Sequence, residues 1–247
     1  MRHGGSSPSS PPTPLLVRMH PDLYDHRLVD RSVQALKFDA AASYQLPSSH
    51  NASCGHSKEA ENLLVVSPYT ERAHLLDLNT LDKPDQLLAK ALTVMKPIRN
   101  DYATAPYIEA FNWDRVIETL RDLAAVEEHD WQHRPFYIVV FRSQSPPTTD
   151  RSYLGLLDES SHKEAVESGG LLKYWYGVPD PVNGRNLATC VWRRRDDARR
   201  GSAGEGHRRA ALAARQMYTE WKIERLALVI RDGVETWDIV DWDSLPS

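Results

Sequence analysis

The chain from residue 135 onward alternates between strand-like and helix-like patterns, and this alternation constrains the fold most strongly. The run FYIVVF at 136–141 is continuously apolar and rich in β-branched side chains, which is typical of a strand buried on both faces. Further strands are expected at 173–178, 186–193, 226–230 and 237–240, the last two joined by the hairpin signal Asp232-Gly233. Helical spacing predicts helices at 158–168, closed by two glycines, and at 206–222.

The order of these elements is strand, helix, strand, strand, helix, strand, with one further strand at the end. It predicts an α+β fold of the ferredoxin-like split βαβ type, with one antiparallel sheet and both helices on one face. In dimeric α+β barrel proteins, to which this arrangement is similar, two such sheets pack together. We therefore expect a ferredoxin-like domain over 134–247, with a homodimer through the sheet face that the helices leave bare.

The residues before 134 have a different pattern. Residues 1–21 contain five prolines and no acidic residue, so they bury too little apolar surface to offset chain entropy and are expected to be a disordered tail. Apolar residues at helical spacing begin near Lys83 and end before Pro97, which stops a helix. A second such stretch begins near Asn112. Region 22–133 is therefore predicted to be mainly helical and packed on the core of the C-terminal domain.

Composition excludes several classes of protein. Two cysteines exclude a disulfide-stapled secreted scaffold, and a net charge of −4 excludes a globally basic nucleic-acid binder. No apolar run reaches the roughly 18 residues that a membrane-spanning helix needs. Nine arginines do gather in 185–215 against three acidic residues. A solvated face with internal ion pairs is the commoner cause of such a cluster, so nucleic acid is not an expected partner.

Two histidines on the predicted helices are candidates for acid–base catalysis. Helical spacing places His162 and His207 on faces with small apolar residues, so both imidazoles are expected to point into the layer between helices and sheet. A neutral imidazole can give or take a proton at working pH, and the N-terminal position of His207 in its helix favours the neutral form. The alternative is that each histidine is a satisfied core or helix-end residue.

Aromatic side chains on two predicted strands suggest a ligand slot. Tyr174 and Tyr176 share one face of their strand and are predicted to donate hydrogen bonds in catalysis. A slot lined by tyrosine and tryptophan suits a flat, largely apolar ligand. The alternative is ordinary core or a dimer surface. The predicted ligand-binding residues are Trp175, Cys190, Trp192, Asn186 and Arg185.

No standard metal or cofactor motif is present. His50, Cys54 and His56 lack a zinc-type spacing, and the glycines at 201–206 follow neither the Walker nor the dinucleotide pattern. We therefore predict neither a metal nor a cofactor; a haem would require His162 or His207 as its axial ligand.

Three longer blocks resemble a family of fungal proteins to which no activity is assigned. They are DYATAPYIEAFNW at 101–113, YWYGVPDPVNGRNLATCVW at 174–192 and HRRAALAARQMYTEWKIERLALVI at 207–230. The resemblance covers most of 85–242 and implies an intracellular fungal protein, expected in the cytoplasm and also in the nucleus.

These observations together predict a small-molecule enzyme. Its substrate would be a small hydrophobic or aromatic metabolite, and its chemistry would be histidine-based proton transfer of the isomerase, cyclase, lyase or cofactor-free oxygenase type. The alternative is a non-catalytic module for ligand binding or assembly.

Overall fold

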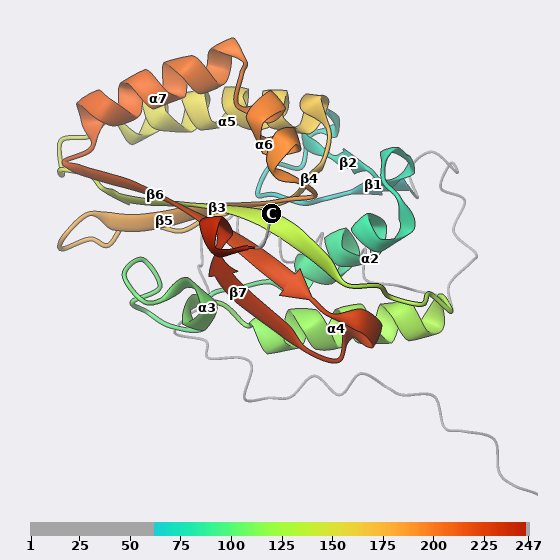
Figure 1. Ribbon diagram of the computed structural model, residues 1–247. Helices are drawn as coiled ribbons and strands as arrows, with labels where there is room; N and C mark the ends of the chain where they lie inside the picture. Colours follow the sequence, from blue (N-terminus) through green and yellow to red (C-terminus); the bar gives the residue numbers. More distant parts are fainter. Residues whose placement is uncertain (1–61, 246–247) are drawn as a thin grey trace, which may run out of the picture.

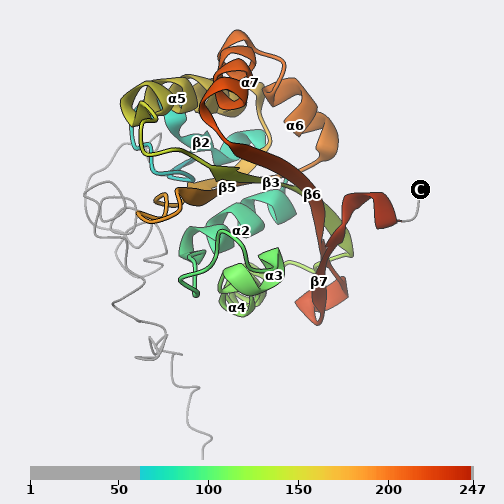
Figure 2. The ribbon, with the colours of Figure 1, turned by 90° about the vertical axis from the view of Figure 1, so that its left-hand side faces the viewer.

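A computed structural model describes residues 62–245, which form three layers with a five-stranded sheet in the middle (Figures 1 and 2). The strands are β1 Leu63–Leu64, β2 Leu76–Asp77, β3 Arg134–Gln144, β4 Leu171–Tyr176, β5 Arg185–Trp192, β6 Glu220–Ile230 and β7 Trp237–Asp241. The α-helices are α2 Lys83–Ala91, α3 Tyr107–Ala110, α4 Trp113–Val126, α5 Arg151–Ser168, α6 Arg195–Gly201 and α7 Glu205–Met217. Short 3₁₀ helices include η3 Arg72–His74 and η7 Trp242–Ser244.

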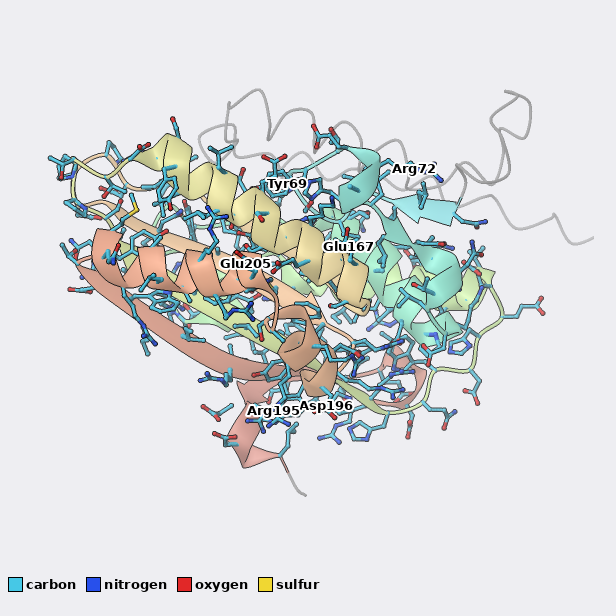
Figure 3. All side chains as sticks on the ribbon, turned by 90° about the horizontal axis from the view of Figure 1, so that it is seen from above. Tyr69, Arg72, Glu167, Arg195, Asp196 and Glu205 are labelled. Carbon is cyan, nitrogen blue, oxygen red and sulfur yellow. The ribbon has the colours of Figure 1, made fainter. Side chains whose placement is uncertain are left out.

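The strand order confirms the ferredoxin-like prediction. The main sheet runs β4-β5-β3-β6-β7, and every neighbouring pair is antiparallel. The unit β3-α5-β4-β5-α7-β6 is therefore the split βαβ arrangement, with β3 and β5 at its centre. Helices α5 and α7 lie side by side over one face, which we call the upper face (Figure 3).

The opposite face of the sheet is not bare, so the premise of the predicted sheet-to-sheet dimer is wrong. Helices α2 and α4 lie beneath this lower face (Figure 2). One hydrophobic cluster joins Leu88 and Leu120 of these helices to Ile138, Leu187 and Leu228 of three strands, all fully buried. The apolar side chains that a second sheet would cover are already covered by this chain.

Several boundaries in the C-terminal half differ from the predicted ones, and helix α5 begins at Arg151 rather than near Asp158. Helix α7 ends at Met217, and Trp221 belongs to β6, which begins at Glu220 rather than near Leu226. A helix that the sequence pattern did not predict, α6, follows β5 directly. It has no apolar stripe and is tied together by ion pairs, such as that between Arg199 and Asp196 at 3.2 Å.

Within the described residues, none of the helices combines the length and the apolar character needed to cross a bilayer. Residues 1–21 and the His50, Cys54 and His56 group lie outside the described part of the chain.

The turn before β5 has a glycine that we expect no other residue to replace. Gly184 has φ of +70°, and a Cβ built on it would lie 1.9 Å from the carbonyl oxygen of Ser145. That oxygen belongs to the backbone of Ser145. This backbone cannot easily move away, because the Ser145 N–H donates a hydrogen bond to the carbonyl oxygen of Gly184 at 3.0 Å. Replacing Gly184 with alanine should therefore lower the free energy of unfolding by about 2 kcal/mol or more.

The matched control for this substitution is Gly155→Ala. Gly155 lies inside α5 with open space where a Cβ would be. Alanine there should raise stability by about 0.5–1 kcal/mol, because helix interiors favour alanine over glycine. Urea unfolding of both variants measures the contrast. Equal stability of the two variants would show that the Gly184 turn tolerates a side chain.

Candidate functional site

A carboxylate from α5 lies between two tyrosines in the layer above the sheet. The Asp158 side chain accepts a hydrogen bond from the Tyr69 hydroxyl at 2.5 Å and a second, short one from the Tyr174 hydroxyl. Tyr174 comes from β4, whereas Tyr69 comes from the loop before η3 and lies on the side of α5 away from α7 (Figure 3). The consecutive elements α5 and β4 and a loop 89 residues before Asp158 therefore meet at one acidic group.

One turn further along α5, two imidazoles form a buried pair. His162 lies four residues after Asp158, and so on the same helix face. Its Nδ1 is 2.8 Å from Nδ1 of His74, and both side chains are buried. The Tyr69 ring lies against both imidazoles, with centroid distances of 4.9 Å and 5.1 Å. The carboxylate and the two imidazoles thus belong to one cluster.

Only one proton can occupy the contact between the two Nδ1 atoms, and this restricts the state of His162. The Nε2 atom of His74 lies 3.9 Å from Glu159. When His74 donates from Nδ1, His162 accepts at Nδ1 and carries its own hydrogen on Nε2. This Nε2 is buried and has no hydrogen-bond partner among the described residues. In that tautomer His162 presents an unpaired donor inside the protein.

Burial sets the protonation of the cluster. It is the main cause that lowers the pKa of His162 to about 3, with the charges of His74 and His207 adding to it. Burial also raises the pKa of Asp158, against the two tyrosine hydrogen bonds, which lower it. The pKa of Tyr174 is raised by burial and by the Asp158 charge. His162 is hence a neutral imidazole, and Asp158 is the more basic group of the two.

Several side chains of the upper face keep partial exposure. Val139 is partly exposed, whereas its strand neighbours Ile138 and Val140 on the lower face are fully buried. Cys190 is partly exposed in the same way between the buried Thr189 and Val191. Solvent therefore reaches part of the upper face of the sheet beside the α5–α7 pair. This part is lined by further partly exposed residues, namely Phe141, Tyr176, Met217, Tyr218, Trp221 and Ile223.

Several of the predicted site residues meet in this layer. His162, Tyr174, Tyr176 and Cys190 all face the α5–α7 side, and the Tyr174 and Tyr176 rings lie 5.8 Å apart. Burial raises the pKa of the Cys190 thiol. The structure does not pair His207 with His162. His207 lies at the start of α7, where its Nδ1 is 3.1 Å from Glu164, which also accepts from the His207 backbone N–H.

The two predicted tryptophans do not share a slot. Trp175, one of the two tryptophans predicted to pack the substrate, is on the lower face, edge-on to Phe111 at 5.0 Å, and so does not lie in the layer of Tyr174 and His162. Trp192 is on the upper face but lies under α6, against Gly201. Strand alternation correctly separates the two faces of β4, and it is the tyrosines that face the layer.

The predicted polar pair at the start of β5 lies away from the cluster. Arg185 is held in an ion pair with Glu220 at 2.9 Å. Asn186 donates from Nδ2 to the carbonyl oxygen of Gly177 at 2.9 Å. Its Oδ1 is buried and has no partner among the described residues.

The sequence patterns missed Tyr69, His74 and Asp158. The spacing of Asp158 four residues before His162 was a usable signal, because such pairs share a helix face. Tyr69 and His74 had none, since they lie in a loop and in the short 3₁₀ helix η3, about 90 residues before their partners in sequence. Within residues 62–245, no three histidine, cysteine or acidic side chains are grouped to hold a metal ion.

The fold and this cluster define a ferredoxin-like α+β protein with a polar, partly exposed layer under its two crossover helices. The chain belongs to the family described as PB2B2.08-like, whose model matches residues 65–241. A relative, UPF0643 protein PB2B2.08 of Schizosaccharomyces pombe, is 41% identical over 173 residues, covering 68% of this chain and 79% of the relative. Membership in a fungal family is thereby confirmed.

Two solved structures overlap with part of the chain. Rv0793 from Mycobacterium tuberculosis is 16% identical, with a TM-score of 0.33, over 37% of this chain and 92% of its own. SnoaB, a cofactor-independent oxygenase from Streptomyces nogalater, is 14% identical, with a TM-score of 0.31, over 37% of this chain and 90% of its own. The fold is assigned here from the strand order of this chain.

Proposed function

We propose that the protein binds a small hydrophobic or aromatic metabolite between the sheet and the α5–α7 pair and catalyses a proton transfer on it. The observation that carries this proposal is the partly exposed layer in which Asp158, His162 and two tyrosines meet. A layer that served only as core would gain little from a buried carboxylate and two imidazoles, because each costs free energy to desolvate.

The residues divide the chemistry among them. Asp158 takes the proton from carbon next to a carbonyl group, since burial makes this carboxylate more basic than usual. His162 donates its Nε2 hydrogen to the oxygen on which negative charge develops, as a neutral polarising group. Tyr69 and Tyr174 hold the carboxylate in place, and aromatic walls exclude water from the substrate. This assignment replaces the predicted base, histidine, by an aspartate.

Isomerisation and cyclisation both begin with such a proton abstraction, so the proposal covers these classes first. No residue of the proposed step needs a metal or an organic cofactor. We place the activity in the cytoplasm or nucleus, in line with what the family resemblance implies.

The test uses β-tetralone, a flat aromatic ketone with acidic hydrogens next to its carbonyl group. The protein should accelerate exchange of these hydrogens in deuterated buffer above the buffer rate, followed by proton NMR. Asp158→Asn should reduce the acceleration about 100-fold, because the amide cannot take the proton. Glu167→Gln is the matched control, since this exposed α5 carboxylate lies apart from the cluster and should leave the rate unchanged.

Two results would contradict the proposal. Exchange by the wild-type protein at the buffer rate, with binding of β-tetralone seen by calorimetry, would favour the non-catalytic binding module. Equal exchange by wild type and Asp158→Asn would remove Asp158 from the chemistry.

A further inference from the structure

A hollow lies at the start of β3, at the opposite end of this strand from the partly exposed residues beside the cluster. Its volume is about 620 Å³, and it is situated where α2 and β3 begin and β5 ends. Three arginines, Arg134, Arg193 and Arg194, contribute to its lining. Apolar surface comes from two prolines and from the Trp242 indole ring of η7. The lining therefore combines guanidinium groups with a flat aromatic wall.

Two of the arginines are held in fixed positions by carboxylates on their inner side. Arg134 contacts Asp82 at 3.0 Å and the fully buried Asp85 at 3.1 Å. Arg193 contacts the buried Asp197 through Nε at 2.8 Å and Nη2 at 3.2 Å, and it lies 3.8 Å from Asp85. Because a guanidinium group has five N–H donors, each of these arginines keeps donors beyond those used by the carboxylates. Holding the side chains in place lowers the entropy cost of binding a ligand.

The third arginine of the lining, Arg194, has no ion pair with a described carboxylate. Its side chain is exposed. Of the two acidic groups of the lining, Asp82 is paired with Arg134, whereas Asp130 accepts a hydrogen bond from Gln132 at 2.8 Å and keeps its charge. Asp130 is therefore the one acidic group of the lining that opposes an incoming anion, and Arg194 is the group that supplies uncompensated positive charge.

We propose that this hollow binds a phosphate ester attached to a flat ring system. A guanidinium group can bind two phosphate oxygens at once, and here Arg194 supplies a charge that no described carboxylate balances, while the remaining N–H groups of Arg134 and Arg193 can donate further hydrogen bonds. The ring would lie against Trp242, and the volume exceeds what inorganic phosphate alone would fill. This site shares no residue with the proposed catalytic cluster, so the phosphate-binding proposal does not depend on the proposed function.

Calorimetry with α-naphthyl phosphate tests the proposal on the full-length protein at low salt. Wild type should bind it, and Arg194→Gln should weaken binding about tenfold, because one charge-assisted hydrogen bond is lost. Arg195→Gln is the matched control: it removes the same charge from the next residue, which does not line the hollow. Trp242→Leu should also weaken binding of the ester but not of inorganic phosphate.

The related probes separate the parts of the ligand. Uncharged α-naphthol should bind far more weakly than its phosphate ester, and α-naphthoate, with a single charge, should be intermediate. Equal binding of α-naphthol and the ester would overturn the proposal, as would equal weakening by Arg194→Gln and Arg195→Gln, which would indicate a diffuse charge effect. Absence of any binding of the ester by wild type would also overturn it.

Discussion

Lowering the pH below about 6.5 is expected to remove several kcal/mol of stability through one buried imidazole, His162. In the folded protein, burial first, and then the charges of His74 and His207, lower the pKa of His162 to about 3. The unfolded chain takes up a proton there near pH 6.5, whereas the folded protein does not. The contribution is therefore complete above about pH 6.5 and is lost as the pH falls toward about 3, with an upper limit of roughly 5 kcal/mol.

The measurement is urea unfolding across this acid range for wild type and His162→Gln. Glutamine cannot take the proton, so the variant should lose stability much less steeply on acidification. Any difference from wild type at neutral pH then comes from the changed contact with His74. The comparison also cancels the opposing effect of Asp85, whose pKa burial raises to about 7. His133→Gln is the control, because this imidazole is exposed. Parallel stability curves for wild type and His162→Gln would contradict the prediction.

The order of strands and helices was predictable because each element has its own hydrophobic periodicity. The apolar run at 136–141 and the alternation of Tyr174 and Tyr176 require only neighbouring residues to be recognised. The start of β6 was not, since Met217 and Trp221 continue a helical spacing of four past the end of α7. Only pairing with β3, where Trp221 lies opposite Ser143, makes this segment a strand.

The site depended on packing that no local pattern records. Periodicity groups His162 with its helix face, but it cannot show that His74 reaches this face from a 3₁₀ turn 88 residues earlier. Periodicity also cannot show whether His207 contacts the sheet or helix α5. In the structure its imidazole contacts Glu164 of α5. Likewise, two amphipathic helices were evident before residue 130, yet their burial under the sheet follows from the tertiary contacts alone.

For the arginine-rich segment 185–215, composition predicted the kind of interaction but not the role of each residue. Composition predicted internal ion pairs, and Arg185, Arg193, Arg199 and Arg200 each have one. Composition could not identify which of the remaining arginines lines a hollow. The position of Arg194 at the rim of a hollow is what distinguishes it.

Replacing Trp113 with alanine is expected to destabilise the whole described protein, and not only the helices under the sheet. Trp113 begins α4 and is 1% exposed, with Tyr107 and Phe111 around its ring at 5.7 Å and 6.4 Å. Removing so large a buried side chain leaves a cavity and should cost about 3–5 kcal/mol. For a chain of this size, the loss corresponds to a fall in Tm of roughly ten degrees.

The loss should be global because a single hydrophobic cluster contains Trp113 and side chains of the central strands, such as Ile138 and Val191. Circular dichroism of the helices and NMR signals of β4 and β5 should then report one shared unfolding midpoint in Trp113→Ala. Val126→Ala on the same helix is the control, since Val126 is 74% exposed and should change stability by less than about 0.5 kcal/mol. If the helical signal were lost first while β4 and β5 kept the wild-type midpoint, α2 and α4 would be a separable layer. The lower face of the sheet would then be open to a partner, as the dimeric α+β barrel comparison first suggested.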